Sequence, residues 1–267
     1  MHSILTLIVT AGLVTAQTNT NLQTKFPTAT STTGISAART IAAGASFDGQ
    51  MLQWDRSPST CKEQTEGGEK DALFVLENGA TLSNVIVGPG AGEGIYCKGS
   101  CTLNNVWWTD VCEDAATFLQ SSGTSYVNGG GARNAADKVF QHNGGGTVSV
   151  KNFLSSKNGK IYRSCGNCKT QVARKSIFEN IRAIDSLSVV AGVNANFGDS
   201  TTIKNSCLLK GRTCDIFEGN NSGKEPTKIG TGPSGTANTA TTKAKHPAGV
   251  KRMFLRQGMS DFGNSDA

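Results

Sequence analysis

The chain has 267 residues, of which 32 are glycine, 6 are proline and 17% are charged. This length fits one domain with short appendages, and beyond the first residues no stretch is apolar for long enough to cross a membrane, which excludes a protein with several membrane spans. The net charge of +6 favours a polyanionic partner. Short apolar runs separated by Gly, Asn, Ser and Thr, with little helical periodicity, predict an all-β chain.

Residues 1–16 have the features of a secretory signal peptide. Ile4 to Val14 form a short apolar run, and small residues then precede Gln17 at a site suited to cleavage. The run is too short to span a bilayer, which weakens the alternative of a membrane anchor. We therefore predict a secreted, extracellular protein.

The eight cysteines fit that compartment. An even count in a secreted chain predicts up to four disulfides, although the pairing cannot be deduced from sequence. Cys165 and Cys168 have the spacing of a redox motif, but the βαβ context of such a motif is absent, so a structural bridge is favoured. The eight are Cys61, Cys97, Cys101, Cys112, Cys165, Cys168, Cys207 and Cys214.

An internal repeat follows the first cysteine. An apolar residue, any residue and then Asn recur at spacings of 21, 23, 24, 28 and 25 residues. Units this small cannot bury an apolar face alone, whereas stacked coils share a continuous core. We therefore predict a right-handed parallel β-helix, a single-stranded solenoid of about 7–8 coils, over residues 17–220. The repeated asparagines are Asn84, Asn105, Asn128, Asn152, Asn180 and Asn205.

The composition changes after the last unit. From residue 221 Gly, Thr, Lys and Pro dominate and the apolar spacing ends. We interpret residues 221–267 as a basic tail that is partly disordered.

Charged residues recur at similar distances from the repeated asparagines. Glu93 and Asp114 each lie nine residues after an Asn, as does Asp137. If the coils stack, such residues form one row with strands about 4.8 Å apart. Acids then occupy the earlier coils and bases the later ones: Glu93, Glu113, Asp114 and Asp137, with Asp110 nearby, are followed by Lys138, Lys160 and Arg163.

Carboxylate oxygens are hard ligands that suit Ca²⁺. The metal ligands we expect are Glu93, Glu113, Asp114 and Asp137. Lys138, Lys160 and Arg163 would contact the acid groups of a polyanion lying across both halves. The alternative is a solvated charged face without a site, and recurrence over four units favours a site.

Four stretches of the sequence resemble polysaccharide lyase family 3 pectate lyases. They are DALFVLENGATLSNVIVG, GIYCKGSCTLNNVWWTDVCEDAAT, ADKVFQHNGGGTVSVKNF and GKIYRSCGNCK, in the family's order. The resemblance runs from about residue 26 to 220, and the tail after residue 230 departs from the usual family ending. It implies a secreted, calcium-dependent enzyme on a compact parallel β-helix.

The resemblance also implies roles for individual residues. Glu113 and Asp114 match calcium-site acids. Glu93 stands where the family typically has Asp, and Glu is longer by one methylene. Lys138 matches the proposed catalytic base. Two further basic residues, Lys160 and Arg163, match the substrate site, and Asp137 would contribute to a calcium that arrives with substrate.

Pectate lyases cleave α-1,4-polygalacturonate by β-elimination, leaving 4,5-unsaturated products. The proton on C5 is weakly acidic, so calcium and cationic side chains must stabilise the charge that develops when Lys138 removes it. We expect Lys160, Arg163 and calcium to lower the pKa of Lys138, and an alkaline activity optimum. Arg163 is the second candidate base, although a guanidinium is hard to deprotonate.

Two other functions remain open at this point. A polygalacturonase-type hydrolase would use the carboxylates as general acid and base. A non-catalytic pectin-binding protein would keep the fold and the basic groove. In every case we expect a monomer that binds pectate and neither nucleic acid nor a membrane.

Overall fold

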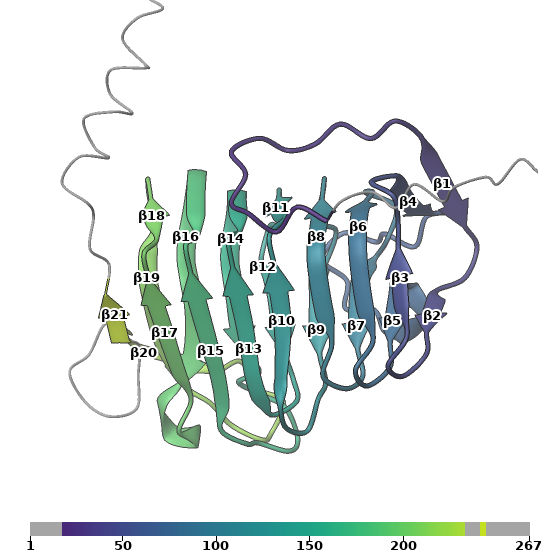
Figure 1. Ribbon diagram of the computed structural model, residues 1–267. Helices are drawn as coiled ribbons and strands as arrows, with labels where there is room; N and C mark the ends of the chain where they lie inside the picture. Colours follow the sequence, from purple (N-terminus) through teal and green to yellow (C-terminus); the bar gives the residue numbers. More distant parts are fainter. Residues whose placement is uncertain (1–17, 233–240, 244–267) are drawn as a thin grey trace, which may run out of the picture.

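The computed structural model describes residues 18–232 and 241–243, so the predicted signal peptide and most of the predicted tail lie outside it. Strands from successive turns pair in parallel and form an all-β solenoid of about 8 turns, which confirms the predicted fold class. Figure 1 shows the strands stacked side by side in chain order. Two short 3-10 helices, η1 (Glu69–Asp71) and η2 (Ala195–Phe197), interrupt the turns.

The first stack of strands carries the candidate site. Each strand pairs in parallel with the next, and the last strand of the stack pairs with an antiparallel one. In order, the stack contains β2 (Arg39–Ile41), β5 (Ala72–Leu76), β7 (Glu93–Cys97), β9 (Asp114–Phe118), β12 (Lys138–His142), β14 (Leu154–Ser164), β16 (Arg182–Asn194), β19 (Arg212–Glu218) and the antiparallel β20 (Thr227–Gly232).

The second stack precedes the repeated asparagines in each turn. It contains β3 (Ser46–Asp48), β6 (Thr81–Val87), β8 (Thr102–Trp108), β10 (Thr124–Asn128), β13 (Gly146–Lys151), β15 (Arg174–Glu179), β17 (Ser200–Lys204) and β21 (Thr241–Lys243).

The third stack follows the asparagines. It joins β1 (Thr32–Ile35), β4 (Gln53–Arg56), β11 (Gly131–Arg133) and β18 (Cys207–Leu208) to β6, β8, β14 and β16, the longer strands that bend from one stack into the next.

The repeated asparagines form the corner between the second and third stacks. Five of the six have left-handed backbone, with φ between 53° and 59°, a conformation that Asn tolerates better than most residues. Their side chains also bond along the stack: Asn105 Nδ2 donates to Asn84 Oδ1 at 2.9 Å, and Asn180 Nδ2 to Asn152 Oδ1 at 2.7 Å. The repeat was therefore a real structural signal.

One unit differs from the predicted register. Asn128 pairs with Asn104 in the ladder, and Gly131 with Trp107. Gly129, with φ of 72°, therefore occupies the corner opposite Asn105, because glycine adopts left-handed backbone without a Cβ clash. The expected position of Asn128 was wrong by one residue.

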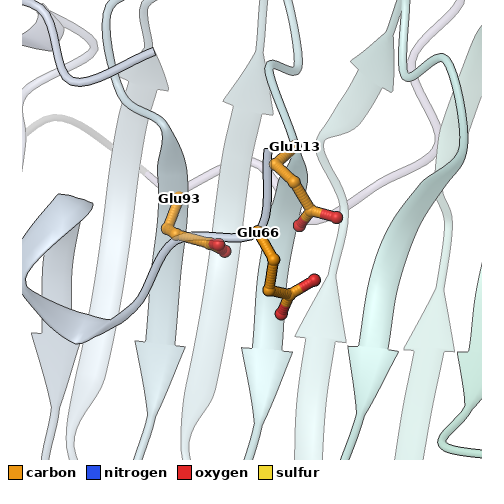
Figure 2. A group of neighbouring side chains, drawn as sticks. All are labelled: Glu66, Glu93 and Glu113. Carbon is orange, nitrogen blue, oxygen red and sulfur yellow. The ribbon is translucent and has the colours of Figure 1, made fainter. Parts of the chain in front are cut away.

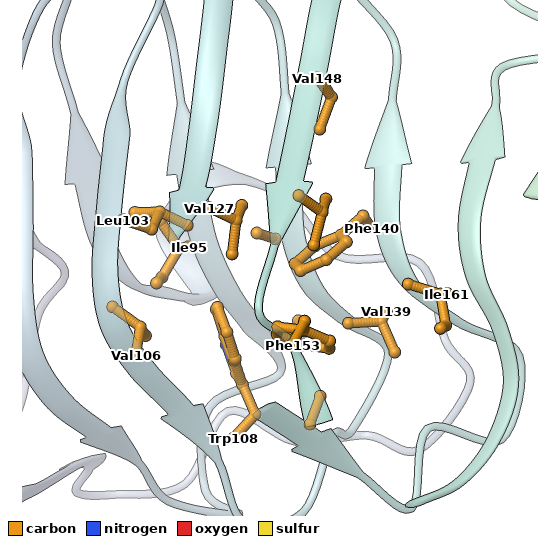
Figure 3. Close-up of a cluster of buried hydrophobic side chains, with 14 of the residues drawn as sticks. Ile95, Leu103, Val106, Trp108, Val127, Val139, Phe140, Val148, Phe153 and Ile161 are labelled. Atoms are coloured by element: carbon orange, nitrogen blue, oxygen red, sulfur yellow. The ribbon is translucent and has the colours of Figure 1, made fainter. Parts of the chain in front are cut away.

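Aromatic side chains fill the interior of the middle turns. Trp108 lies 5.9 Å from Phe140 between ring centroids, and Phe140 lies 5.3 Å from Phe153. The first pair packs edge-on and the second is tilted, and such contacts add to the gain from burying the rings. Figure 3 shows these rings with valines, leucine and isoleucines from neighbouring turns in one continuous core.

The segment before β1 covers the asparagine corner. Thr20 O accepts a hydrogen bond from Asn152 Nδ2 at 2.8 Å, and the ring of Phe26 lies 5.3 Å from that of Trp107. In Figure 1 this segment crosses several turns of the solenoid.

At the C-terminal end of the first stack, β20 runs antiparallel to β19 and covers its edge. Lys228 on β20 contacts Asp215 Oδ1 at 2.8 Å, and Arg212 Nε contacts the same oxygen at 2.9 Å. This strand lies beyond the boundary at residue 220 that we predicted for the solenoid. The added strand pairs with an edge that would otherwise leave backbone groups unpaired.

Three disulfides join six of the eight cysteines. They are Cys61–Cys112, Cys97–Cys101 and Cys165–Cys168, so the Cys165–Gly–Asn–Cys168 segment contains a bridge, as predicted. Among the residues that the structure covers, no helix has the length and apolar character needed to cross a bilayer.

Candidate active site

The parallel register places acids and bases in one row across the first stack. Glu93 on β7 pairs with Asp114 on β9, and Lys138 on β12 pairs with Lys160 on β14. Phe140 pairs with Ala116, so Lys138 stands opposite Asp114 two residues earlier. Because Gly129 is the corner of its turn, the residue nine positions later is Lys138 and not Asp137. The row therefore continues from Asp114 to Lys138, where the sequence analysis had expected Asp137.

Three glutamates gather at the acidic end of the row. Glu66, Glu93 and Glu113 each offer a carboxylate oxygen, and these atoms lie within 4.8 Å of one another. Figure 2 shows Glu93 and Glu113 on the strand side and Glu66 on a loop in front of them. We call these three residues the glutamate triad.

Glu66 was missed by the sequence analysis. It lies in the loop before η1, outside the repeat, and two contacts bring this loop to β9: the Cys61–Cys112 disulfide and a hydrogen bond of 2.6 Å from Gln64 Nε2 to Cys112 O. Gly67 N also donates to Glu93 Oε1 at 3.0 Å. The only signal for Glu66 was that disulfide, whose pairing cannot be read from sequence.

The electrostatics of the triad favour a bound cation. Burial and then the charge of Glu113 raise the pKa of Glu93 to about 8. Burial also raises the pKa of Asp114, with Lys138 opposing the shift and Glu113 adding to it. Glu113 Oε2 is buried and has no hydrogen-bond partner among the described residues. Clustered oxygen donors that repel one another fit a hard cation such as Ca²⁺.

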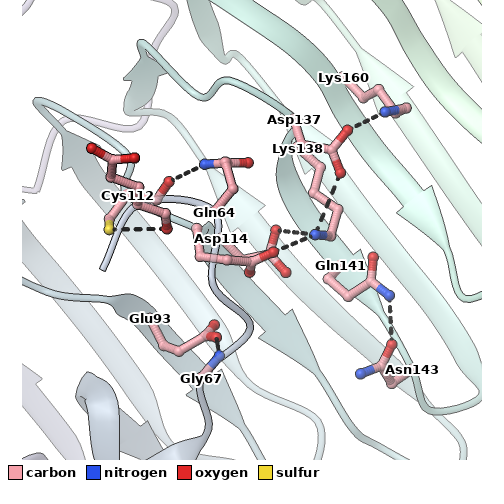
Figure 4. Close-up of polar contacts among 12 residues, drawn as sticks. Gln64, Gly67, Glu93, Cys112, Asp114, Asp137, Lys138, Gln141, Asn143 and Lys160 are labelled. Carbon is pink, nitrogen blue, oxygen red and sulfur yellow. Dashed lines mark hydrogen bonds and ion pairs between the residues drawn. The ribbon is translucent and has the colours of Figure 1, made fainter. Parts of the chain in front are cut away.

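Lys138 bridges the acids to the rest of the row. Its Nζ lies 2.7 Å from Glu113 Oε1, 3.1 Å from Asp114 Oδ1 and 3.5 Å from Asp137 Oδ2; Figure 4 draws these contacts. Burial alone would lower the pKa of Lys138, but the carboxylates outweigh burial and raise it. The described neighbours of Lys138 are mainly acids, so they raise its pKa, and the predicted lowering by calcium and the neighbouring bases stays a prediction.

Asp137 is separated from the triad. It forms an ion pair with Lys160, visible in Figure 4, and burial of the carboxylate is outweighed by the hydrogen bond and charge of Lys160, so the pKa of Asp137 is lowered. Asp110, the other acid considered, is exposed on the turn before β9. Of the four predicted metal ligands, Glu93 and Glu113 therefore lie in the triad, Asp114 lies between the triad and Lys138, and Asp137 lies among the lysines.

The basic residues line a groove of about 600 Å³. Arg163 is nearly buried in its wall, its Cζ 4.0 Å above the ring centre of Phe217, and burial lowers its pKa. Glu66 stands at the triad end of the groove, and the Cys165–Cys168 loop is also part of the lining. The groove is lined by Glu66, Asp137, Lys138, Gln141, Asn143, Lys160, Arg163, Cys165, Gly166, Asn167, Cys168, Phe217, Glu225 and Pro226.

Fold and site together define a class: a parallel β-solenoid enzyme in which a carboxylate triad adjoins a groove with three basic side chains. The comparisons with known proteins identify the family within that class. The sequence matches the family model described as pectate lyase over residues 23–224.

Curated relatives carry the same description. The probable pectate lyase E of Neosartorya fischeri is 43% identical over 238 residues, which are 86% of this chain and 93% of that protein. Pectate lyase H of Emericella nidulans is 47% identical over 194 residues, 72% of this chain and 74% of that protein. This chain therefore belongs to the pectate lyase family and is an enzyme of that kind.

Solved structures of bacterial pectate lyases share the fold. The catalytic domain of PelI from Erwinia chrysanthemi superposes with a TM-score of 0.61 at 28% identity, covering 80% of this chain and 98% of that domain. Pel3 from Pectobacterium carotovorum gives a TM-score of 0.66 at 28% identity, covering 78% of this chain and 68% of that one.

Proposed function

We propose that this enzyme cleaves de-esterified α-1,4-polygalacturonate outside the cell by calcium-dependent β-elimination, with 4,5-unsaturated oligogalacturonides as products and plant cell-wall pectin as the natural polymer. The observation that carries the proposal is the row from Glu93 to Lys160, in which a cation-binding triad directly adjoins the lysines of the groove. A related solved structure, with 29% identity and a TM-score of 0.59, is PelI in complex with tetragalacturonic acid.

Calcium would be held first by Glu66, Glu93 and Glu113, since these offer adjacent oxygens and Glu113 Oε2 lacks another partner in the described part of the chain. We propose Asp114 and Asp137 as further ligands, because both contact Lys138, which also contacts Glu113 of the triad, and Asp137 lines the groove. When bound, the ion would neutralise the acids and the uronate carboxylate next to C5.

Lys138 is the base in this proposal. As the free amine, its Nζ takes the proton from C5, the electron pair forms the C4–C5 double bond, and the C4–O bond breaks. The leaving oxygen takes a proton from water. In the structure Lys138 is held as a cation by Glu113, Asp114 and Asp137, so these acids must be neutralised before it acts as a base.

Lys160 and Arg163 bind uronate carboxylates. Arg163 uses Nη1 within the protein, in hydrogen bonds to Ser164 O at 2.8 Å and Asn194 Oδ1 at 3.1 Å. Its Nη2 is buried, so Nε is the donor left for a carboxylate in the groove. Lys160, half-buried beside Asp137, supplies a second charge to the groove.

Three disulfides support an extracellular address, because such bonds persist in oxidising compartments. The predicted signal peptide at residues 1–16 supports the same address.

The test is the ultraviolet absorbance of products from polygalacturonate, with calcium and then with a chelator. A rise that the chelator stops, and that a Lys138→Met variant lacks, is the expected result. New reducing ends without absorbance would point to a hydrolase, and binding without either product to a non-catalytic protein. Either outcome would overturn the proposal.

A further inference from the structure

A buried polar network lies beneath the groove next to Arg163. Asn194 ends β16, and Asp199 follows η2 after a left-handed Gly198. Both side chains are fully buried. Buried polar groups cost stability unless they are hydrogen-bonded, so the arrangement of these bonds indicates what the network does.

The carboxylate of Asp199 is fixed by donors on both oxygens. Its Oδ1 accepts from Arg174 N at 2.9 Å, and its Oδ2 accepts from Asn194 N at 2.8 Å and from Ser164 Oγ. Three donors from three segments hold the group in one orientation.

That orientation determines how the amide of Asn194 points. Nδ2 donates to Asp199 Oδ2 at 2.9 Å and to Cys165 O at 3.1 Å. A flipped amide would place Oδ1 against these two acceptors, which would repel it. The carbonyl Oδ1 of Asn194 must therefore face the other way, where it accepts from Arg163 Nη1 at 3.1 Å.

Arg163 is thereby held in one plane. Nη1 also donates to Ser164 O at 2.8 Å, and the guanidinium Cζ lies over the Phe217 ring, 4.0 Å from its centre. Nη2 is buried and has no hydrogen-bond partner in the part of the chain that the structure covers. A Cβ at residue 166 would lie 2.5 Å from Nη2 and 2.8 Å from Asn194 Oδ1, so Gly166 leaves the room that this arrangement needs.

We propose that Asn194 and Asp199 are positioning residues: Asp199 orients the amide of Asn194, which engages Nη1 of Arg163 and thereby keeps Nε available to a uronate carboxylate in the groove. This inference rests on the role of Arg163 in the proposed function. It concerns protein groups outside the calcium site and does not depend on how the ion is held.

A double-mutant cycle tests the proposal. Asn194→Ala should lower kcat/KM on polygalacturonate about tenfold to a hundredfold, the loss expected when a charged group loses a hydrogen bond. In an Arg163→Gln background the same substitution should change kcat/KM by less than about twofold, because the group it positions is gone. Asp199→Asn should give a smaller loss, which Arg163→Gln should also abolish.

Asn196→Ala is the matched control. Asn196 lies in the same turn and exchanges hydrogen bonds of 2.8 Å with Gly219 on the backbone, so its loss tests disruption of the turn itself. We expect wild-type kcat/KM from this variant. Circular dichroism and thermal unfolding should show that every variant folds, and Asn194→Ser replaces Asn194→Ala if the latter does not.

The outcomes separate the inference from the proposed function. No unsaturated product from the wild type overturns the lyase proposal itself. An active wild type with an unaffected Arg163→Gln variant overturns the role of Arg163, and this inference with it. A folded Asn194→Ala variant with wild-type kcat/KM, or with an equal loss in both backgrounds, overturns the positioning role alone.

Discussion

At the scale of single residues, Lys138 occupies an unusual place for a base, because three carboxylates surround its ammonium group. We predict that Lys138→Met lowers kcat by about 10²- to 10⁴-fold, the range for loss of a general base. The measurement is initial-rate absorbance at saturating substrate and calcium. Lys175→Met, at the exposed position of β15, is the control and should keep wild-type kcat. A Lys138→Arg variant with most of the wild-type turnover would contradict the assignment.

Glu66 is the residue through which the loop before η1 reaches the metal site. We predict that Glu66→Gln weakens calcium binding by roughly tenfold, since the charge of the ligands sets affinity for this ion. Titration calorimetry without substrate measures this directly. Glu63→Gln, an exposed position of the same loop, should bind calcium as the wild type does. Equal affinities for all three proteins would remove Glu66 from the site.

The ionisation of Glu93, in the same site, makes the stability of the protein depend on pH. Its pKa of about 8 exceeds the ordinary 4.5, so between these values the folded state holds a proton that the unfolded state releases. Stability without calcium should therefore fall as pH rises through this window and change no further above about pH 8. His142, whose pKa is lowered to about 4 by burial, adds an opposing rise in stability near pH 6.5, where the unfolded histidine titrates, and comparing the wild type with Glu93→Gln cancels it.

The expected observation is a melting temperature in chelator that decreases from pH 6.5 to 8 in the wild type and decreases less in Glu93→Gln. Calcium should raise the melting temperature more at pH 8 than at pH 6.5, because ionised carboxylates bind it. A flat profile in chelator would show that Glu93 is ionised throughout.

At the scale of elements, the asparagine corner determines where each turn bends from the second stack to the third. Asn105 combines left-handed backbone at φ of 55° with side-chain bonds to Asn84 at 2.9 Å and from Trp107 Nε1 at 2.8 Å. We predict that Asn105→Ala lowers the free energy of unfolding by about 2–4 kcal/mol, from backbone strain and lost hydrogen bonds. Asn105→Gly removes the strain and should lose less. Denaturant unfolding at equilibrium compares them, and equal losses would exclude strain as a cause.

The same corner explains how far the sequence could predict the site. Glu93 and Asp114 were placed in one row because both of their turns keep nine residues after a corner Asn. Asp137 was misplaced because the corner of its turn is Gly129, and a glycine does not mark its position as a repeated asparagine does. The repeat therefore predicted the fold and most of the row, and it failed where two residue types serve the same backbone conformation.

At the scale of the whole molecule, contacts that occur once and do not recur from turn to turn were not predicted from the sequence. Glu66 enters the site through a loop that no repeat includes, and the network of Asn194 and Asp199 joins segments about thirty residues from Arg163. Sequence periodicity reports which residues stack, since stacking repeats at each turn. It does not report which loop folds over the stack, because that depends on one disulfide and a few unique hydrogen bonds.

The disulfides allow this loop to be tested separately from the solenoid. Cys61–Cys112 closes a separation of 51 residues and holds the Glu66 loop against β9, whereas Cys97–Cys101 closes a separation of 4 within one turn. On loop-closure entropy alone, the first bridge stabilises the fold by about 4 kcal/mol and the second by about 2 kcal/mol. We predict that Cys61→Ser/Cys112→Ser weakens calcium binding as well as stability, and that Cys97→Ser/Cys101→Ser affects stability alone.

Calorimetric titration with calcium at a temperature where both double variants are folded separates the two effects. Wild-type calcium affinity in Cys61→Ser/Cys112→Ser would show that Gln64 and Gly67 suffice to hold the loop, through their bonds to Cys112 O and Glu93. Weakened affinity in both variants would instead mean that overall stability, and not the position of Glu66, governs the metal site. Only a loss confined to the Cys61–Cys112 variant supports the role that the structure gives this loop, because of the two bridges only Cys61–Cys112 joins the Glu66 loop to the segment that leads into Glu113 and β9.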